Sequence, residues 1–172
     1  MQYKITPPTH IEDTIQLPAS KSISNRALII HALAGGNIMP ENLSTCDDTV
    51  VIARAFKDNP YEIDIMAAGT AMRFMTAYLS VTEGEHVLTG TERMKQRPIK
   101  ILVDALRFLG ADIQYTGEEG FPPLLIKGKK LKGGSVEVAG NVSSQYVSAL
   151  LMIGPTLEKG LELKLLGNVI SR

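Results

Sequence analysis

The sequence contains few of the residues that carry redox or metal chemistry. Its 172 residues include no tryptophan, one cysteine and three histidines. A disulfide within the chain is therefore excluded. His10, His31 and His86 lie far apart in the sequence, and together with Cys46 they show no metal-ligand spacing. We expect neither a metal nor another cofactor.

The sequence also lacks an excess of one charge and a long apolar run. Lys plus Arg equals Asp plus Glu at 18 each, which argues against a general nucleic-acid-binding protein. No apolar stretch is long enough to span a membrane, and the start, MQYKITPPTH, lacks the features of a signal peptide. Hydrophobic residues make up 44%, enough for a packed core. We expect a soluble cytoplasmic protein that binds neither nucleic acid nor membrane.

The apolar pattern alternates between strand-like and helix-like segments. Helices are predicted at 20–34, 47–57, 70–81, 97–109 and 143–153. Strands are predicted at 37–43, 61–66, 85–89, 111–115, 123–127, 134–138 and 161–166, with extended segments at 2–6 and 12–17. This alternation predicts an α/β or α+β fold with several crossovers.

Three segments of the sequence resemble one another, and they lie at 17–36, 66–84 and 139–160. Each begins with small and hydroxyl residues and continues into an apolar helix that ends at Gly. A long polar residue follows the hydroxyls about one turn later, and these residues are Arg26, Arg73 and Gln145. The sequence therefore predicts a weak internal repeat within one compact body.

The starts of these three helices are candidates for an anion site. A helix start presents unpaired N–H groups and the positive end of the helix dipole, so it favours phosphate or carboxylate. Lys21 and Arg26 add positive charge at the first start. The alternative is structural: Ser20, Ser22, Ser143 and Ser144 only cap helices, Gly69–Thr70 is only a turn and a cap, and the two cations lie on a solvated face.

The segment GTERMKQRPIK, at 90–100, concentrates positive charge between the second and third repeats. Its cations are Arg93, Lys95, Arg97 and Lys100. An exposed basic loop is one interpretation. The other is that Arg97 offers its planar guanidinium to a phosphate or carboxylate beside the helix starts.

Four motifs carry a resemblance to a known family. PASKSISNRAL, AGTAMRF, ERMKQRPI…LVDALRFLGADI and SSQYVSALLM are similar to motifs of the 5-enolpyruvylshikimate-3-phosphate synthase family and follow in the same order. The resemblance implies transfer of the enolpyruvyl group of phosphoenolpyruvate to the 5-hydroxyl of shikimate 3-phosphate, with release of phosphate, on the route to chorismate. It also implies two domains, each built from three βαβαββ units in an inside-out barrel, and a target of glyphosate.

The resemblance also implies roles for individual residues. Those matching contacts to shikimate 3-phosphate are Lys21, Ser22, Arg26, Ser143, Ser144, Gln145 and Ser171. Those matching contacts to phosphoenolpyruvate are Lys21, Gly69, Thr70, Arg97 and Gln145. Lys21 is expected to be catalytic as a candidate proton carrier, whereas Arg73 and Arg93 are expected to support the site.

The sequence departs from the family pattern at two positions. Ala67 stands where family members often have Asn, and Phe74 stands where many have Pro. The first change removes or replaces a polar contact near phosphoenolpyruvate. Both changes bear on the affinity for phosphoenolpyruvate and for inhibitors that mimic it.

Length is the larger departure, because members of the family are more than twice as long. We expect 1–18 to belong with the hinge and the missing C-terminal domain. Residues 19–172 are expected to form the N-terminal substrate-binding domain with an incomplete third repeat. In the family, the acid/base carboxylates lie beyond this point, so the chain is expected to be inactive alone and the full-length protein to be a monomer.

Two alternatives remain open from the residues. One is the sister enzyme that transfers enolpyruvyl to UDP-N-acetylglucosamine. Its usual reactive cysteine has no counterpart in the loop TGTERMKQ, and the only thiol, Cys46, precedes a different helix. The other is an anion-binding or structural repeat module without catalytic activity.

Overall fold

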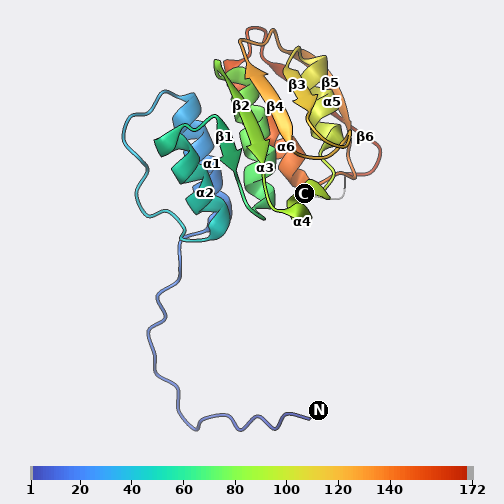
Figure 1. The fold of residues 1–172 in the computed structure, drawn as a ribbon. Coiled ribbons are helices and arrows are strands. Elements are labelled where there is room, and N and C mark those ends of the chain that lie inside the picture. Colours follow the sequence, from blue (N-terminus) through green and yellow to red (C-terminus); the bar gives the residue numbers. More distant parts are fainter. Residues whose placement is uncertain (1, 170–172) are drawn as a thin grey trace.

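The computed structural model describes residues 2–169 of the chain. Residues 2–18 are exposed, form no helix or strand, and lead away from the rest of the protein (Figure 1). The segments 2–6 and 12–17, predicted to be extended, therefore form no strand in the described structure. Within the described residues, all helices and strands lie in the body that follows, from residue 21 onward.

The body is a mixed α/β fold, as the sequence predicted. Its helices are α1 (Lys21–Leu33), α2 (Asp47–Asp58), α3 (Gly69–Val81), α4 (Glu92–Lys95), α5 (Lys100–Phe108), α6 (Ser144–Ile153) and the 3₁₀ turn η1 (Gly154–Thr156). Its strands are β1 (Glu62–Asp64), β2 (Gly84–Thr89), β3 (Asp112–Tyr115), β4 (Leu124–Gly128), β5 (Gly134–Ala139) and β6 (Leu161–Leu166).

The strands form two sheets, whose connections determine where the helices begin. One sheet has the order β1-β2-β4-β3, and the other pairs β5 with β6. The β1–β2 and β5–β6 pairs are parallel, whereas β4 is antiparallel to both of its neighbours. Parallel neighbours need a crossover, and α3 and α6 supply the two crossovers. Both helices therefore begin beyond the carboxyl end of a strand.

Helix α3 is the centre of the core: it packs against α1, α2, α5 and α6, and it lies behind β2 and β4 of the four-stranded sheet in Figure 1. Nearly all of its residues are buried, including Met72, Phe74 and Met75. Two of its buried hydroxyls are satisfied within the helix, because Thr76 donates to the Met72 carbonyl at 2.7 Å and Ser80 donates to the Thr76 carbonyl at 2.7 Å. A helix buried on all sides has little freedom to move, so its first turn is a rigid platform.

Two predictions about elements were wrong. The segment 37–43 is not a strand; Pro40 lacks an N–H donor there, and Asn42 has a φ of 51°. The predicted helix at 97–109 begins only at Lys100. The residues before it form the separate turn α4, after which the Arg97 N–H donates to the Met94 carbonyl at 3.0 Å. Pro98 therefore precedes α5 rather than lying in its first turn.

Candidate active site

The starts of α1 and α6 are capped by serine, whereas the start of α3 is not. Ser20 Oγ accepts the Ile23 N–H at 3.4 Å, and Ser143 Oγ accepts the Gln145 N–H at 3.3 Å. Ala68 precedes α3 and has no side chain that can cap it. The capping prediction thus holds for Ser20 and Ser143, while the first N–H groups of α3 need another partner.

That partner is Asp48, in the first turn of α2. Asp48 Oδ1 accepts the Thr70 N–H at 3.0 Å, and Asp48 Oδ2 accepts from Lys21 Nζ at 3.1 Å. Thr70 Oγ1 in turn accepts from Gln145 Nε2 at 3.2 Å. We call Lys21, Asp48, Thr70 and Gln145 the helix-start cluster. Its hydrogen bonds join the first turns of α1, α2, α3 and α6 at one place.

Arg97 lies against the start of α3 from another side. Its guanidinium is so close to Gly69 that a Cβ at that position would overlap it. Arg97 also lines a small hollow of about 220 Å³ with Ala67, Arg93 and Met94. Burial, followed by repulsion from Arg73 and Arg93, lowers the pKa of Arg97. A guanidinium remains protonated at neutral pH, so this hollow presents concentrated positive charge.

Arg26 is held in place by contacts to α6 and α3. Its Nη2 donates to Ser148 Oγ at 2.8 Å and its Nη1 to the Ser22 carbonyl at 3.0 Å. Its guanidinium carbon lies 5.4 Å from the centre of the buried Phe74 ring, within cation–π range. Phe74, one of the two departures from the family pattern, thus packs below a predicted substrate-binding cation.

Arg73 is buried and supports the loop that carries Arg97. It donates to the Gly69 carbonyl and to the Pro98 carbonyl, both at 3.1 Å. The Tyr146 hydroxyl donates to the same Pro98 carbonyl at 2.8 Å. Two side chains from α3 and α6 therefore hold the chain next to Arg97. We infer that the role of Arg73 is to fix this loop.

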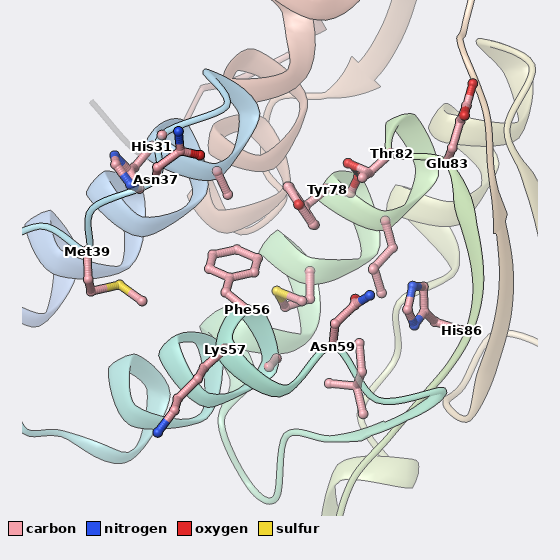
Figure 2. A pocket seen from close by; sticks show the side chains of 16 residues that line it. His31, Asn37, Met39, Phe56, Lys57, Asn59, Tyr78, Thr82, Glu83 and His86 are labelled. Atoms are coloured by element: carbon pink, nitrogen blue, oxygen red, sulfur yellow. Dashed lines mark hydrogen bonds between the residues drawn. The ribbon is translucent and has the colours of Figure 1, made fainter.

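A larger hollow lies at the opposite ends of the helices (Figure 2). Its volume is about 540 Å³, and its lining includes His31 in the last turn of α1, Lys57 in the last turn of α2 and Thr82 at the end of α3. No predicted site residue within 2–169 lines it. Helix ends present carbonyl groups and the negative end of the dipole, so this hollow is a poor anion site.

Comparison with known proteins identifies the family. The profile of the family described as "EPSP synthase (3-phosphoshikimate 1-carboxyvinyltransferase)" matches residues 5–58 and 53–172. The chain belongs to the EPSP synthase family. Structurally it is similar to EPSP synthase from Acinetobacter baumannii, with a TM-score of 0.71 and 26% identity over 83% of this chain and 38% of that chain.

Two curated relatives carry the name 3-phosphoshikimate 1-carboxyvinyltransferase. The protein from Bacteroides fragilis (strain ATCC 25285) is 63% identical over 172 residues, which are 100% of this chain and 42% of the relative. The protein from Mannheimia succiniciproducens is 41% identical over 98% of this chain and 46% of its own length. The chain thus spans less than half the length of these members of the EPSP synthase family.

The structure brings together most of the residues that the family resemblance predicts. Lys21 and Thr70 are linked through Asp48, Gln145 donates to Thr70, and Arg97 adjoins Gly69. Ser22, Ser143 and Ser144 are exposed in the first turns of the same helices or at their caps. Ser171 lies outside the described residues. Within 2–169 no group of His, Cys, Asp or Glu has the arrangement of a metal site, and no helix could cross a membrane.

Sequence reasoning missed Asp48 as a member of the site. Asp48 lies in the first turn of the helix predicted at 47–57, and the start of that helix was not among the three candidate anion sites. A further signal was present, because Asp48 lies on the same helical face as Val51, Ile52 and Ala55, which are all buried. A carboxylate on the apolar face needs a partner inside the protein. Asp47, one residue earlier, is exposed.

Proposed function

We propose that this chain forms one side of the active site of an enolpyruvyl transferase. The full enzyme transfers the enolpyruvyl group of phosphoenolpyruvate to the 5-hydroxyl of shikimate 3-phosphate and releases phosphate. Family membership supports this reaction class. The observation that carries the proposal is the convergence of four helix starts, with Lys21 and Arg97, at one place.

Both substrates are anions, and the geometry provides for both. Shikimate 3-phosphate would lie over the starts of α1 and α6, in contact with the residues Lys21, Ser22, Arg26, Ser143, Ser144 and Gln145. Phosphoenolpyruvate would lie at the start of α3, with Gly69, Thr70 and Arg97. Lys21 and Gln145 would contact both substrates; their links to Thr70, through Asp48 for Lys21 and directly for Gln145, support this role. Ser171 is proposed as a further ligand of the 3-phosphate.

The reaction is an addition followed by an elimination. C3 of phosphoenolpyruvate takes a proton, the 5-hydroxyl attacks C2 and loses its proton, and the tetrahedral intermediate then loses a C3 proton and its phosphate. This chain contributes binding, orientation and positive charge, and Lys21 is its candidate proton carrier. We assign the acid/base carboxylates to the part of the relatives' length that this chain does not span.

This assignment implies a division of the chain and of the enzyme. We propose that 1–18 belongs with the hinge and the second domain, since these residues make no regular element with the body. Residues 19–172 would form the N-terminal substrate-binding domain, with an incomplete third repeat. The 172-residue chain would bind shikimate 3-phosphate weakly and would not turn over alone. The complete enzyme would be a cytoplasmic monomer.

Calorimetry tests the binding part of the proposal. The 172-residue chain should bind shikimate 3-phosphate with measurable heat, and Lys21→Ala should weaken that binding by about tenfold, the loss expected for one charge-assisted hydrogen bond. Lys164→Ala, which changes an exposed cation on β6, is the matched control. No heat with the parent chain, or equal affinity of the parent and Lys21→Ala, contradicts the assignment.

Activity can be tested in a joined protein. It consists of residues 1–172 of this chain followed by the part of the Bacteroides fragilis relative that this chain does not match. Coupled phosphate release in the presence of both substrates should be detected for the joined protein and not for the 172-residue chain. The unmodified relative is the positive control. A joined protein that folds, binds both substrates and releases no phosphate would refute the proposed reaction.

The alternative acceptor, UDP-N-acetylglucosamine, has no support from the geometry. Cys46 precedes α2 and its Sγ lies 3.2 Å from Thr49 Oγ1, so its contact is within its own turn. The segment that carries Arg97 contains no thiol. The joined protein should therefore release phosphate with shikimate 3-phosphate and not with UDP-N-acetylglucosamine.

A further inference from the structure

Asp48 places a carboxylate inside a site that attracts anions. Its side chain is 11% exposed, while that of Lys21 is 50% exposed. Both oxygens of Asp48 are used, one by the Lys21 ammonium and one by the backbone of Thr70. A buried carboxylate is stable only when it is paired and hydrogen-bonded, and Asp48 meets both conditions.

The surroundings of Asp48 are positive on several sides. It lies in the first turn of α2, at the positive end of that helix, and accepts from the first turn of α3. The attraction of Asp48 also reaches Arg97, where it partly offsets the lowering of the pKa caused by burial and by Arg73 and Arg93. Asp48 is therefore the countercharge shared by Lys21, Arg97 and two helix starts.

We propose that Asp48 is a positioning residue that holds Lys21 and the start of α3 in a fixed relation for catalysis. The inference rests on the proposed enolpyruvyl transfer and deepens it, because it concerns the same site. Asp48 does not contact substrate in this role; it acts through Lys21 and Thr70. Gln145 belongs to the same unit, since its Nε2 donates to Thr70 Oγ1.

The need for such a residue follows from the nature of the lysine side chain. A lysine has a flexible four-carbon stem and a charge without directional preference, so an exposed lysine samples many positions. The contact with Asp48 restricts the Lys21 ammonium to one side of the site. Thr70 lies on the buried helix α3, so the second oxygen ties that position to a rigid element.

Asp48→Asn in the joined protein is the principal test. The amide keeps an acceptor for the Thr70 N–H but loses the charge that holds Lys21. We expect kcat to fall by about 10- to 100-fold, the effect typical of a misplaced catalytic group, with the KM for shikimate 3-phosphate changed by less than about threefold. Asp47→Asn is the matched control, since it removes the same charge from the same first turn at an exposed position; its kcat should stay within about twofold of the parent.

The kinetic split separates positioning from two other roles. If Asp48 only competed with substrate anions, Asp48→Asn would lower KM and keep kcat. If Asp48 only stabilised the fold, the melting temperature would fall while kcat at a permissive temperature stayed equal to that of Asp47→Asn. Either result overturns the proposal. Asp48→Glu, which keeps the charge on a longer side chain, should have a kcat between those of the parent and Asp48→Asn, and a kcat equal to that of the parent also overturns the proposal.

A measurement without turnover separates this inference from the proposed function. In the 172-residue chain, acetylation of lysine by acetic anhydride followed by mass spectrometry reports how freely the Lys21 amine reacts. Asp48→Asn should increase labelling of Lys21 at least about threefold over Asp47→Asn, because the ammonium is released from its partner. Equal labelling refutes the positioning contact, even when the joined protein is active. If the unmodified joined protein is inactive but labelling increases, the proposed function fails while the contact stands.

Discussion

The two ends of the helices α1, α2 and α3 form surfaces of opposite chemistry. At their starts, Lys21 and Thr70 each donate a hydrogen bond to Asp48, and Arg97 lies against Gly69. At their ends, a hollow of about 540 Å³ is lined by His31, Lys57 and other residues (Figure 2). The volume of the hollow at the ends is more than twice the approximately 220 Å³ next to Arg97.

The larger volume therefore lies at the helix ends, away from the proposed substrate site at the helix starts. The two surfaces differ in which backbone groups they present: N–H groups point into the surface at the helix starts, whereas carbonyl groups point into the hollow at the helix ends. Lysine is present at both, but at the ends Lys57 adjoins Asp58, and Glu83 also lines the hollow. The comparison predicts that anion binding depends on residues at the starts and is insensitive to residues at the ends.

The largest effect is expected from Arg97→Ala. This change removes the proposed charge-assisted contact to phosphoenolpyruvate and should raise the KM for phosphoenolpyruvate in the joined protein by about 10- to 100-fold. Lys95→Ala is the matched control from the same basic segment; it should change KM by less than about twofold, because Lys95 is paired with Glu92 at 2.8 Å. Steady-state kinetics with varied phosphoenolpyruvate decides the matter. Equal effects of the two changes would mean that general charge, rather than position, governs binding.

Gly69→Ala should have the next largest effect. The added Cβ would displace the Arg97 guanidinium, so the KM for phosphoenolpyruvate should rise by about tenfold, while the affinity for shikimate 3-phosphate stays constant. Gly36→Ala is a close control at the other end, where the added Cβ would displace the His31 ring. Kinetics of both variants should show a change for Gly69→Ala alone. A similar rise for Gly36→Ala would refute the contrast between the two ends.

These residues also show how far the sequence predicts the site. The helix starts were predictable, because Ser20 and Ser143 precede apolar helices and Gly69 precedes another. The sequence analysis named these starts as candidates for an anion site, and hydrogen bonds join them in the structure. The hydrogen bonds of Asp48 were not predicted, because they join residues that are 27 and 22 positions apart, and periodicity is a local signal.

The errors in the fold have similarly specific causes. The segment 37–43 contains the apolar residues Ile38, Met39 and Leu43, but its Asn and Pro residues disfavour a strand, and no strand within 2–169 pairs with it. The turn α4 was not predicted, because the basic segment 90–100 was interpreted as one loop that leads into a helix. Met94, the single buried residue of α4, fixes this turn in the core. Burial of one side chain therefore decided a local structure that composition left open.

A smaller effect is expected for Tyr146→Phe, which tests the support of the Arg97 loop. The change removes one hydrogen bond to the Pro98 carbonyl, a group that still accepts from Arg73. The free energy of unfolding should fall by about 1 kcal/mol, measured by urea denaturation of the 172-residue chain. Tyr61→Phe, at an exposed tyrosine, is the control. An unchanged midpoint for Tyr146→Phe would show that this hydrogen bond does not stabilise the loop.

The smallest effect is expected at the helix ends, for the double change His31→Ala and Lys57→Ala. It removes a lysine and an imidazole from the lining of the larger hollow. Because the surrounding helix ends present carbonyl groups, no anion should be held there in the parent chain, and calorimetry with shikimate 3-phosphate should give an affinity within about twofold of the parent. The parallel measurement is Lys21→Ala, expected to weaken the same binding by about tenfold. If the double change weakens binding as much as Lys21→Ala does, the polarity of the helices does not decide where this protein binds anions.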